Sequence, residues 1–191
     1  MSRNVIVCVC TALVMALTCA GAGATTYYVD DDAAGGDGLS WANAFNDLQD
    51  ALTAASSGGG DIWVAEGVYV PSERSDLLVA RTETFTLLNG VTIYGGFPDG
   101  GGGIGDRNIE LYKTTLSGDL NGNDDPLQPF TNYIDNAYHV VTGSGTTGAA
   151  TLTGFTITGG NADGSGAPDQ FGGGLLIYGT TTGTNAGSPL I

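Results

Sequence analysis

Short segments that alternate apolar residues with threonine, and then stop at glycine, recur along most of this chain. In "LTGFTITGGNADG", residues 152–164, the apolar Phe155 and Ile157 alternate with threonines before a pair of glycines. Strict alternation is typical of a β-strand with one buried face. Glycine supplies the positive φ that a sharp corner of the backbone requires. We therefore expect many short strands joined at glycine corners, with Phe155 and Ile157 pointing inward and Thr156 and Thr158 outward.

The same pattern predicts further strands at 26–29, 61–65, 68–71, 85–88, 91–94, 114–117, 139–142, 150–157 and 174–178. An apolar residue marks successive later strands about every twenty residues, at Ile93, Leu116, Val140, Ile157 and Leu176. A β-sandwich would place strands about 8 to 12 residues apart and would join neighbours by tight hairpins. The longer spacing favours a solenoid of stacked parallel strands.

One helix is expected, early in the chain. Ser40 is a suitable N-cap, and apolar residues recur at helical spacing from Trp41 to Ala55, before a Ser-Ser-Gly-Gly-Gly run ends the pattern. Asn43 stands where a capping box would have an acid. An amphipathic helix here would cover the otherwise exposed end of a solenoid.

Residues 1–24 have the pattern of a secretory signal peptide. Arg3 precedes an apolar run that is short for a membrane span, and the segment closes with an A-x-A cleavage pattern at Ala24. A buried core helix is the alternative interpretation. All three cysteines lie in this segment, so the mature chain, residues 25–191, would have neither thiol nor disulfide. Lipidation at Cys19 is the other alternative, although the residues before it match a lipoprotein signal poorly.

The charge balance is strongly acidic. The chain has 20 Asp and Glu against 5 Lys and Arg, a formal net charge of −15. Such a chain repels nucleic-acid phosphates and anionic lipid surfaces, so neither is an expected partner. The excess of acids suits a secreted protein that stays soluble or binds calcium, and a solvated acidic surface explains it equally simply.

A candidate calcium site lies in "SGDLNGNDD". Four oxygen-bearing side chains there have the density of a calcium loop: Asp119, Asn121, Asn123 and Asp125. The spacing departs from an EF-hand, because Asp124 stands at the glycine position and Phe130 at the glutamate position. An Asx-rich surface turn is the alternative interpretation.

No catalytic or organic cofactor site is expected. His139, the sole histidine, lies in "YHVV" and is interpreted as a strand residue rather than a general base. Trp41 and Trp63 are interpreted as core residues packed against the helix, with sugar-stacking platforms as the alternative. Arg107 and Lys113, the cations nearest to Asp119 in sequence, form only a weak set for a lyase.

Several segments together resemble a known family: "YYVDDDAAGGDGLSWANAFNDLQDALTAASSGGGDIWVAEGVYVP", "FTLLNGVTIYGGF", "TTLSGDLNGND", "AYHVVTG", "LTGFTITGGNA" and "GGGLLIYG". Across residues 27–178 they resemble the N-terminal part of secreted bacterial right-handed parallel β-helix proteins of the pectin-lyase-like superfamily. The run Gly173–Leu176 approximates once the repeat of chlamydial polymorphic outer membrane proteins, while that group's Phe-x-x-Asn series is not evident. The resemblance implies an all-β fold, a right-handed parallel β-helix with an N-terminal capping α-helix. Leu190 and Ile191 have the character of a further strand, so truncation at the C-terminus is expected.

The functional expectation is a noncatalytic extracellular or cell-surface β-helix module for adhesion or polysaccharide binding, with calcium as a candidate ligand. Its partner would be an extracellular polysaccharide or a cell-surface glycan. The alternative is a carbohydrate-active enzyme, a polysaccharide lyase or glycoside hydrolase, with its catalytic turns beyond this chain. Location would be secreted or at the cell surface, with outer-membrane association as one arrangement, and with no membrane span once the signal peptide is removed.

Overall fold

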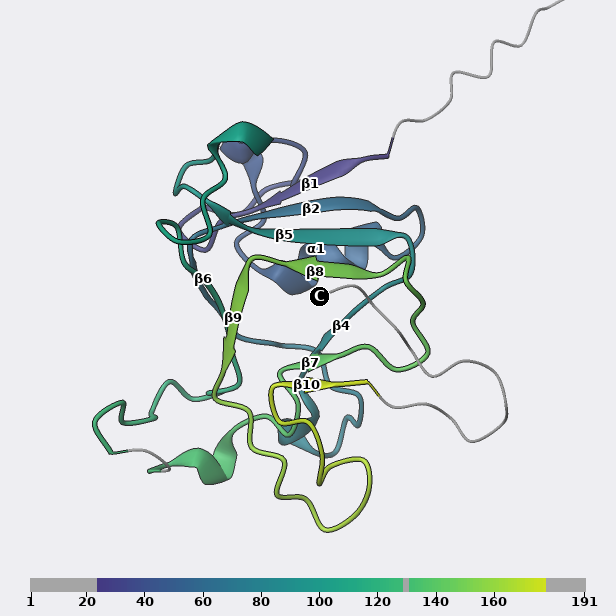
Figure 1. Ribbon diagram of the computed structural model, residues 1–191, viewed down its shortest axis with the longest axis vertical. Helices are drawn as coiled ribbons and strands as arrows, with labels where there is room; N and C mark the ends of the chain where they lie inside the picture. The colour runs from purple at the N-terminus through teal and green to yellow at the C-terminus, as the bar shows by residue number, and fades with distance from the viewer. Residues whose placement is uncertain (1–23, 129–130, 178–191) are drawn as a thin grey trace, which may run out of the picture.

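The computed structural model describes residues 24–128 and 131–177, so the predicted signal peptide and the last residues lie outside the described part. Parallel sheets and one α-helix make up the fold (Figure 1). The strands are β1 (Thr26–Val29), β2 (Gly60–Ala65), β3 (Gly67–Tyr69), β4 (Phe85–Thr86), β5 (Val91–Phe97), β6 (Thr114–Ser117), β7 (Val141–Thr142), β8 (Thr151–Thr153), β9 (Phe155–Thr158) and β10 (Leu175–Leu176). The α-helix is α1 (Leu48–Ala55), and short 3-10 helices lie at Trp41–Asn43, Ala80–Thr82, Ile104–Asp106 and Tyr133–Asp135.

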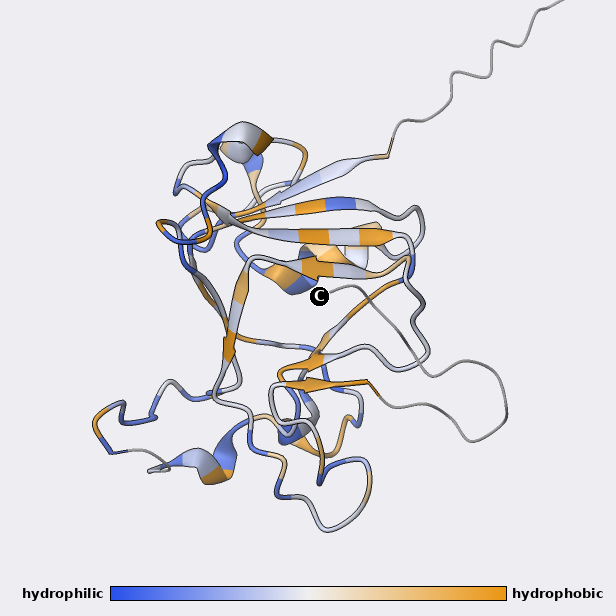
Figure 2. Ribbon diagram, in the orientation of Figure 1, coloured by the Kyte–Doolittle hydropathy of each residue, from blue (hydrophilic) through white to orange (hydrophobic). Residues whose placement is uncertain are grey.

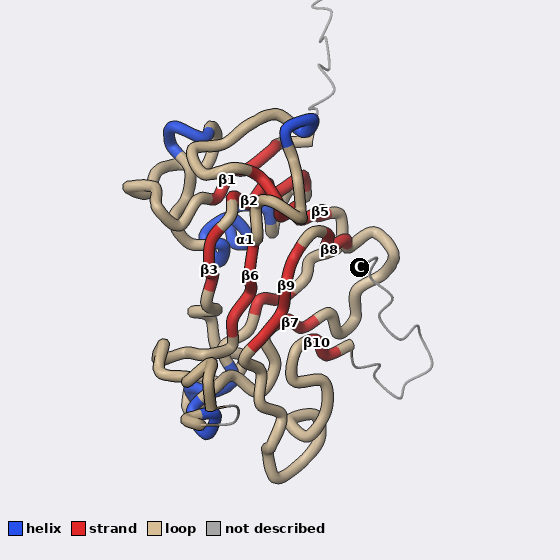
Figure 3. The backbone as a smooth tube through the Cα atoms, turned by 60° about the vertical axis from the view of Figure 1, so that its left-hand side comes forward, coloured by secondary structure: helices blue, strands red, loops and turns tan. Residues whose placement is uncertain are grey.

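The strands form three sheets. The first sheet has the order β1-β2-β5-β8, the second β3-β6-β9 and the third β10-β7-β4. Every pairing between these named strands is parallel, and Figure 3 shows β3, β6 and β9 side by side. Parallel neighbours need long crossover connections, and those connections carry the polar loops described below.

The expected fold class is wrong. The sequence predicted an all-β right-handed parallel β-helix, whereas the described residues form three separate parallel sheets of three or four strands together with α1, a mixed α/β arrangement. No closed solenoid is identified in the part of the chain that the structure describes. The third sheet gives the physical reason, because its strands are only two residues long and irregular connections occupy much of the chain between them.

The spacing of about twenty residues is also wrong as a stacking period. Ile93 pairs with Leu152, not with Leu116, and Leu116 pairs with Ile157 in another sheet. The recurring apolar residues therefore mark successive strands of different sheets. The predicted strand over 150–157 is in fact two strands, β8 and β9, which Gly154 separates at a φ of +84°.

The helix is shorter than the sequence predicted. Trp41–Asn43 is a separate 3-10 turn in which the Ser40 side chain makes no capping hydrogen bond. Phe45 is extended and forms a parallel bridge with Val29. α1 begins only at Leu48, and the Asp47 carboxylate caps it by accepting from the Gln49 amide at 2.8 Å. A carboxylate at the N-cap satisfies a free N–H and complements the helix dipole.

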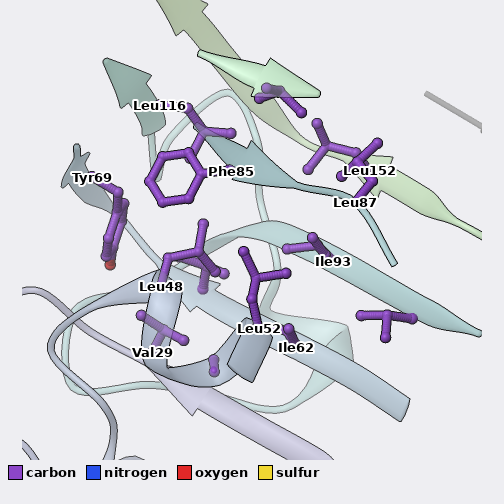
Figure 4. Close-up of a cluster of buried hydrophobic side chains, with 14 of the residues drawn as sticks. Val29, Leu48, Leu52, Ile62, Tyr69, Phe85, Leu87, Ile93, Leu116 and Leu152 are labelled. Atoms are coloured by element: carbon purple, nitrogen blue, oxygen red, sulfur yellow. The ribbon is translucent and has the colours of Figure 1, made fainter. Parts of the chain in front are cut away.

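A single apolar core lies between α1 and the sheets. Leu48 and Leu52 of α1 are buried against Ile62 of β2 and Ile93 of β5, and Phe85 of β4 belongs to the same cluster (Figure 4). Figure 2 shows apolar residues concentrated on α1 and the strands, and polar residues in the protruding loops. Burial of this kind contributes roughly 25 cal/mol per Å² of apolar surface, so the core is the main source of stability.

Trp41 and Trp63 do not pack against α1 as predicted. Trp63 alternates with the core residues Ile62 and Val64 along β2, so its ring lies on the opposite face of the first sheet. It stacks on Phe97 with ring centroids 4.8 Å apart. Trp41 contacts Phe97 as well, at 5.5 Å, and its indole N–H donates to the Gly102 carbonyl. The two indoles therefore form a second apolar cluster, outside the sheet.

Candidate functional site

A pocket of about 230 Å³ opens on the third sheet. Thr142 of β7 and Leu176 of β10 are register partners there and both line the pocket. Val141 precedes Thr142 in β7, and it belongs to the apolar core together with its register partner Phe85 of β4. Because neighbouring residues of a strand point to opposite faces, the pocket lies on the face of the third sheet that is turned away from the core. We call this the His139 pocket, and its lining is Ser75, Thr82, Thr84, Tyr138, His139, Thr142, Ser144, Pro168, Asp169 and Leu176.

His139 is the most distinctive group in the pocket. The residue is only 7% exposed, and its Nδ1 lies 3.2 Å from the Gly172 carbonyl oxygen. A carbonyl can only accept, so Nδ1 carries the proton. Nε2 is buried without a hydrogen-bond partner and lies 3.7 Å from Asp169 Oδ1. In the neutral ring Nε2 is thus a free acceptor, and in the protonated ring it is a donor that faces a carboxylate.

The wall beside His139 is held by Arg81. Its guanidinium lies 4.2 Å from the centre of the Tyr138 ring, a cation–π contact. It also donates to the backbone oxygens of Asn136, at 2.5 Å, and Asn161, at 2.7 Å, and pairs with Asp163 at 2.6 Å. Three separate stretches of chain are therefore tied together around one cation, and Tyr138 keeps a fixed orientation.

The described residues of the pocket include few groups of the kinds that bond cleavage uses. No hydroxyl group reaches the free Nε2 of His139, so no nucleophile is activated in the manner of a serine hydrolase. One carboxylate, Asp169, lines the pocket, whereas glycoside hydrolysis commonly needs two. The nearby cation, Arg81, is engaged by its own partners. What converges is one acid, one imidazole nitrogen, several hydroxyls and the apolar edges of Tyr138, Pro168 and Leu176.

The residues predicted to hold calcium lie together on the connection between β6 and β7. We call residues 119–128 and 131–136 the Asx loop; it extends at lower left in Figure 1. Asp119 accepts from the backbone amides of Asn123 and Asp124. The side-chain amides of Asn121 and Asn123 donate to Asp135 Oδ2, at 2.6 and 2.9 Å.

Asp125 has different partners, because its carboxylate accepts from the Leu127 amide and from the side chain of Gln128. Calcium binding by Asp119, Asn121, Asn123 and Asp125 stays a prediction. Among the described residues, no group of three or more His, Cys, Asp or Glu side chains is positioned to hold a metal ion.

Sequence reasoning missed most of the His139 pocket. Asp169 is brought to His139 by the connection between β9 and β10, and Ser75 and Thr82 come from the connection between β3 and β4. The available signal was polar residues at alternate positions in and next to the third sheet, such as Thr84, Thr86 and Thr142. The Thr142 hydroxyl lies within hydrogen-bonding distance of the hydroxyls of Thr84 and Thr86.

Comparison with family models, with curated proteins and with solved structures found no match. The resemblance to pectin-lyase-like proteins therefore stays a prediction. In the part of the chain that the structure describes, no helix has both the length and the apolar character needed to cross a bilayer.

Proposed function

We propose that the protein is a noncatalytic extracellular or cell-surface module that binds a polysaccharide or a cell-surface glycan, and so serves adhesion. The observation that carries this proposal is the His139 pocket, where a free imidazole nitrogen and the Asp169 carboxylate lie 3.7 Å apart beside apolar side chains. Sugars present hydroxyl groups next to apolar C–H faces. A few converging polar groups on an apolar surface are the usual composition of a small-molecule site.

The size of the pocket indicates how much of a glycan it holds. At about 230 Å³ it is smaller than the roughly 300–1000 Å³ of typical ligand pockets. A single sugar ring at the end of a chain, or one branch of it, is the unit that we propose enters. The hydroxyl donors of that ring would bind the Asp169 carboxylate, and the Tyr138 edge would contact its apolar face.

The charge of the protein decides between neutral and acidic glycans. With a formal net charge of −15 and a carboxylate in the pocket, a uronate or sulfate group would be repelled. We therefore propose a neutral glycan as the ligand.

Isothermal titration calorimetry against a panel of neutral oligosaccharides tests this proposal. Asp169→Asn should weaken binding by at least about tenfold, because a hydrogen bond to a charged acceptor contributes about 1.5–3 kcal/mol and about 1.4 kcal/mol corresponds to tenfold. Asp99→Asn is the matched control, since Asp99 is exposed on the loop after β5 and away from the pocket. Binding that Asp169→Asn and Thr142→Val both leave unchanged would exclude the pocket as the binding site.

A carbohydrate-active enzyme is the second candidate, because a His–Asp pair in a pocket can move a proton. Release of reducing ends from neutral polysaccharides, and of unsaturated uronates from pectin and alginate with and without calcium, tests it. Product release that Asp169→Asn abolishes and Asp99→Asn does not would replace the binding module with an enzyme.

A further inference from the structure

The Asx loop contains buried oxygen atoms that nothing satisfies. Asp124 Oδ1, Asp135 Oδ1 and Asn136 Oδ1 are all shielded from water, and none has a hydrogen-bond partner. Asn136 as a whole is fully buried, at 0% exposed. A buried polar atom without a partner costs about 1–3 kcal/mol, and three such acceptors within a single loop call for a partner such as an ion or a water molecule.

A hydrogen bond joins the two side chains that carry two of these atoms, Asp124 and Asn136. Asn136 Nδ2 donates to Asp124 Oδ2 at 2.8 Å, and Asn136 Oδ1 is bonded to the same carbon as that nitrogen. The free amide oxygen of Asn136 therefore lies next to the Asp124 carboxylate, whose second oxygen is also free. Asp119 holds this segment in place by accepting from the Asp124 backbone amide.

The Asx loop also has an excess of negative charge. Four carboxylates, those of Asp119, Asp124, Asp125 and Asp135, lie within this one loop. Arg81 is the nearest cation, but its guanidinium binds the backbone oxygens of Asn136 and Asn161 and the Asp163 carboxylate. None of the ion pairs among the described residues involves a carboxylate of the Asx loop.

Side-chain amides serve as substitutes for a cation in this arrangement. Asn121 and Asn123 turn their N–H₂ groups toward Asp135 Oδ2. An amide rotated by half a turn presents its oxygen in the same place. The loop can thus exchange amide donors for oxygen ligands without any movement of its backbone.

We propose that the Asx loop binds one calcium ion through the carboxylates of Asp124 and Asp135 and the amide oxygen of Asn136. Calcium accepts six to eight oxygen ligands in irregular geometry at about 2.3–2.6 Å, and it combines carboxylates with amide oxygens and water. Magnesium demands a near-ideal octahedron and binds mostly through carboxylates and its own waters. This ligand set differs from the one predicted from sequence, in which Asp135 and Asn136 do not appear, and it does not depend on glycan binding.

Calorimetric titration of the full chain with calcium chloride, after chelator treatment and at constant ionic strength, tests the proposal. We expect one ion per chain, with a Kd on the order of 10⁻⁴–10⁻³ M, as in extracellular modules. Calcium at about 100 times Kd should raise Tm by several degrees. The absence of heat and of any Tm shift at 10 mM calcium, or an equal response to magnesium, would overturn the proposal.

Two variants locate the site. Asp124→Asn and Asp135→Asn should each weaken calcium binding more than tenfold, whereas Asp99→Asn and the pocket variant Asp169→Asn should leave it unchanged. Asp124→Asn is the more informative of the two, because its new amide still accepts from Asn136 Nδ2 and can donate to the free Asn136 oxygen, so the fold is kept. Calcium binding that survives both loop variants would place the ion elsewhere and overturn the proposal.

Discussion

The region around α1 and the Asx loop differ in the kind of groups that they bury. α1 and the first sheet bury apolar side chains such as Leu48, Ile62 and Ile93 almost completely. Among the described residues, six buried side-chain polar atoms have no hydrogen-bond partner, and four of them belong to residues between Asp124 and His139. The other two, Gln49 Oε1 of α1 and Trp63 Nε1 of β2, lie beside the core, but neither residue belongs to the apolar core cluster. Unsatisfied polar atoms are therefore concentrated around the Asx loop and His139, and the core cluster itself stays apolar.

The largest expected loss of stability comes from a substitution in the apolar core. Leu48→Ala should lower the free energy of unfolding by about 2–5 kcal/mol, because it opens a cavity under α1. Leu48 is 1% exposed and belongs to the core cluster. Leu78→Ala is the matched control, since Leu78 is 93% exposed and should change the free energy by no more than about 0.5 kcal/mol. Urea denaturation measures both, and equal losses would mean that α1 does not cover the core.

A smaller effect is expected at the corner between the first and second sheets. Gly154 has a φ of +84°, and a Cβ there would lie 2.7 Å from the Gly95 carbonyl oxygen and against the Arg107 guanidinium. Gly90 has a similar φ of +79°, but no atom lies within 4 Å of its added Cβ. Gly90→Ala should cost about 1–2 kcal/mol for the left-handed backbone alone.

Gly154→Ala should cost clearly more than that, because the backbone must also move away from Gly95 of β5 and from the Arg107 side chain. The difference between the two alanine variants, measured by urea denaturation, isolates the close approach of the backbones. If both variants lose the same free energy, Gly154 does not lie tightly against Gly95 and Arg107.

A still smaller loss of stability is expected at the N-cap of α1, and it tests where the helix begins. Asp47→Ala should lower the free energy of unfolding by about 1 kcal/mol, because the Gln49 amide loses its acceptor. Ser40→Ala should change it little, since the Ser40 side chain makes no capping hydrogen bond. Thermal unfolding of both variants checks this, and the reverse order would restore the helix start that the sequence favoured.

The strands were predictable to a large extent, and their pairing was not. Alternation and terminal glycines predicted nine strands, which correspond to the ten strands of the described residues because β8 and β9 were predicted as one. A half-buried strand must alternate, so this signal is local. The path of the long connections decides which strands lie side by side. The local sequence pattern does not predict that path. The fold class therefore failed even though the parallel pairing of distant strands is observed.

The candidate site was predictable only in its acidic part. "SGDLNGNDD" drew attention to the Asx loop through its oxygen-rich side chains. The burial of the Asn136 amide and the approach of Asp169 to His139 arise when segments far apart in the sequence meet. The helix start was misplaced for a related reason, since the extended pairing of Phe45 with Val29 interrupts the apolar spacing that continued back to Trp41.

The smallest expected effect concerns two carboxylates of the Asx loop whose pKa values are shifted in opposite directions. Burial raises the pKa of Asp124 above its usual 3.8, and hydrogen bonds from Asn121 and Asn123 lower that of Asp135. When a folded-state pKa is raised, the folded protein takes up the proton first, so the contribution of Asp124 to stability increases as the pH falls toward 3.8. The contribution of Asp135 is present above pH 3.8 and is lost as the pH falls below it.

In calcium-free buffer, the two substitutions should therefore differ in sign and in pH dependence. Asp124→Asn should raise Tm at pH 7, and this gain should shrink as the pH approaches 3.8. Asp135→Asn should lower Tm at pH 7, and its loss should shrink only below pH 3.8. Thermal unfolding between pH 3 and pH 7 follows both, with Asp99→Asn as the control. A drop in Tm for Asp124→Asn at pH 7 would mean that the Asp124 carboxylate is already satisfied without a cation. The contrast between a core without unsatisfied groups and a loop that needs a cation would then no longer hold.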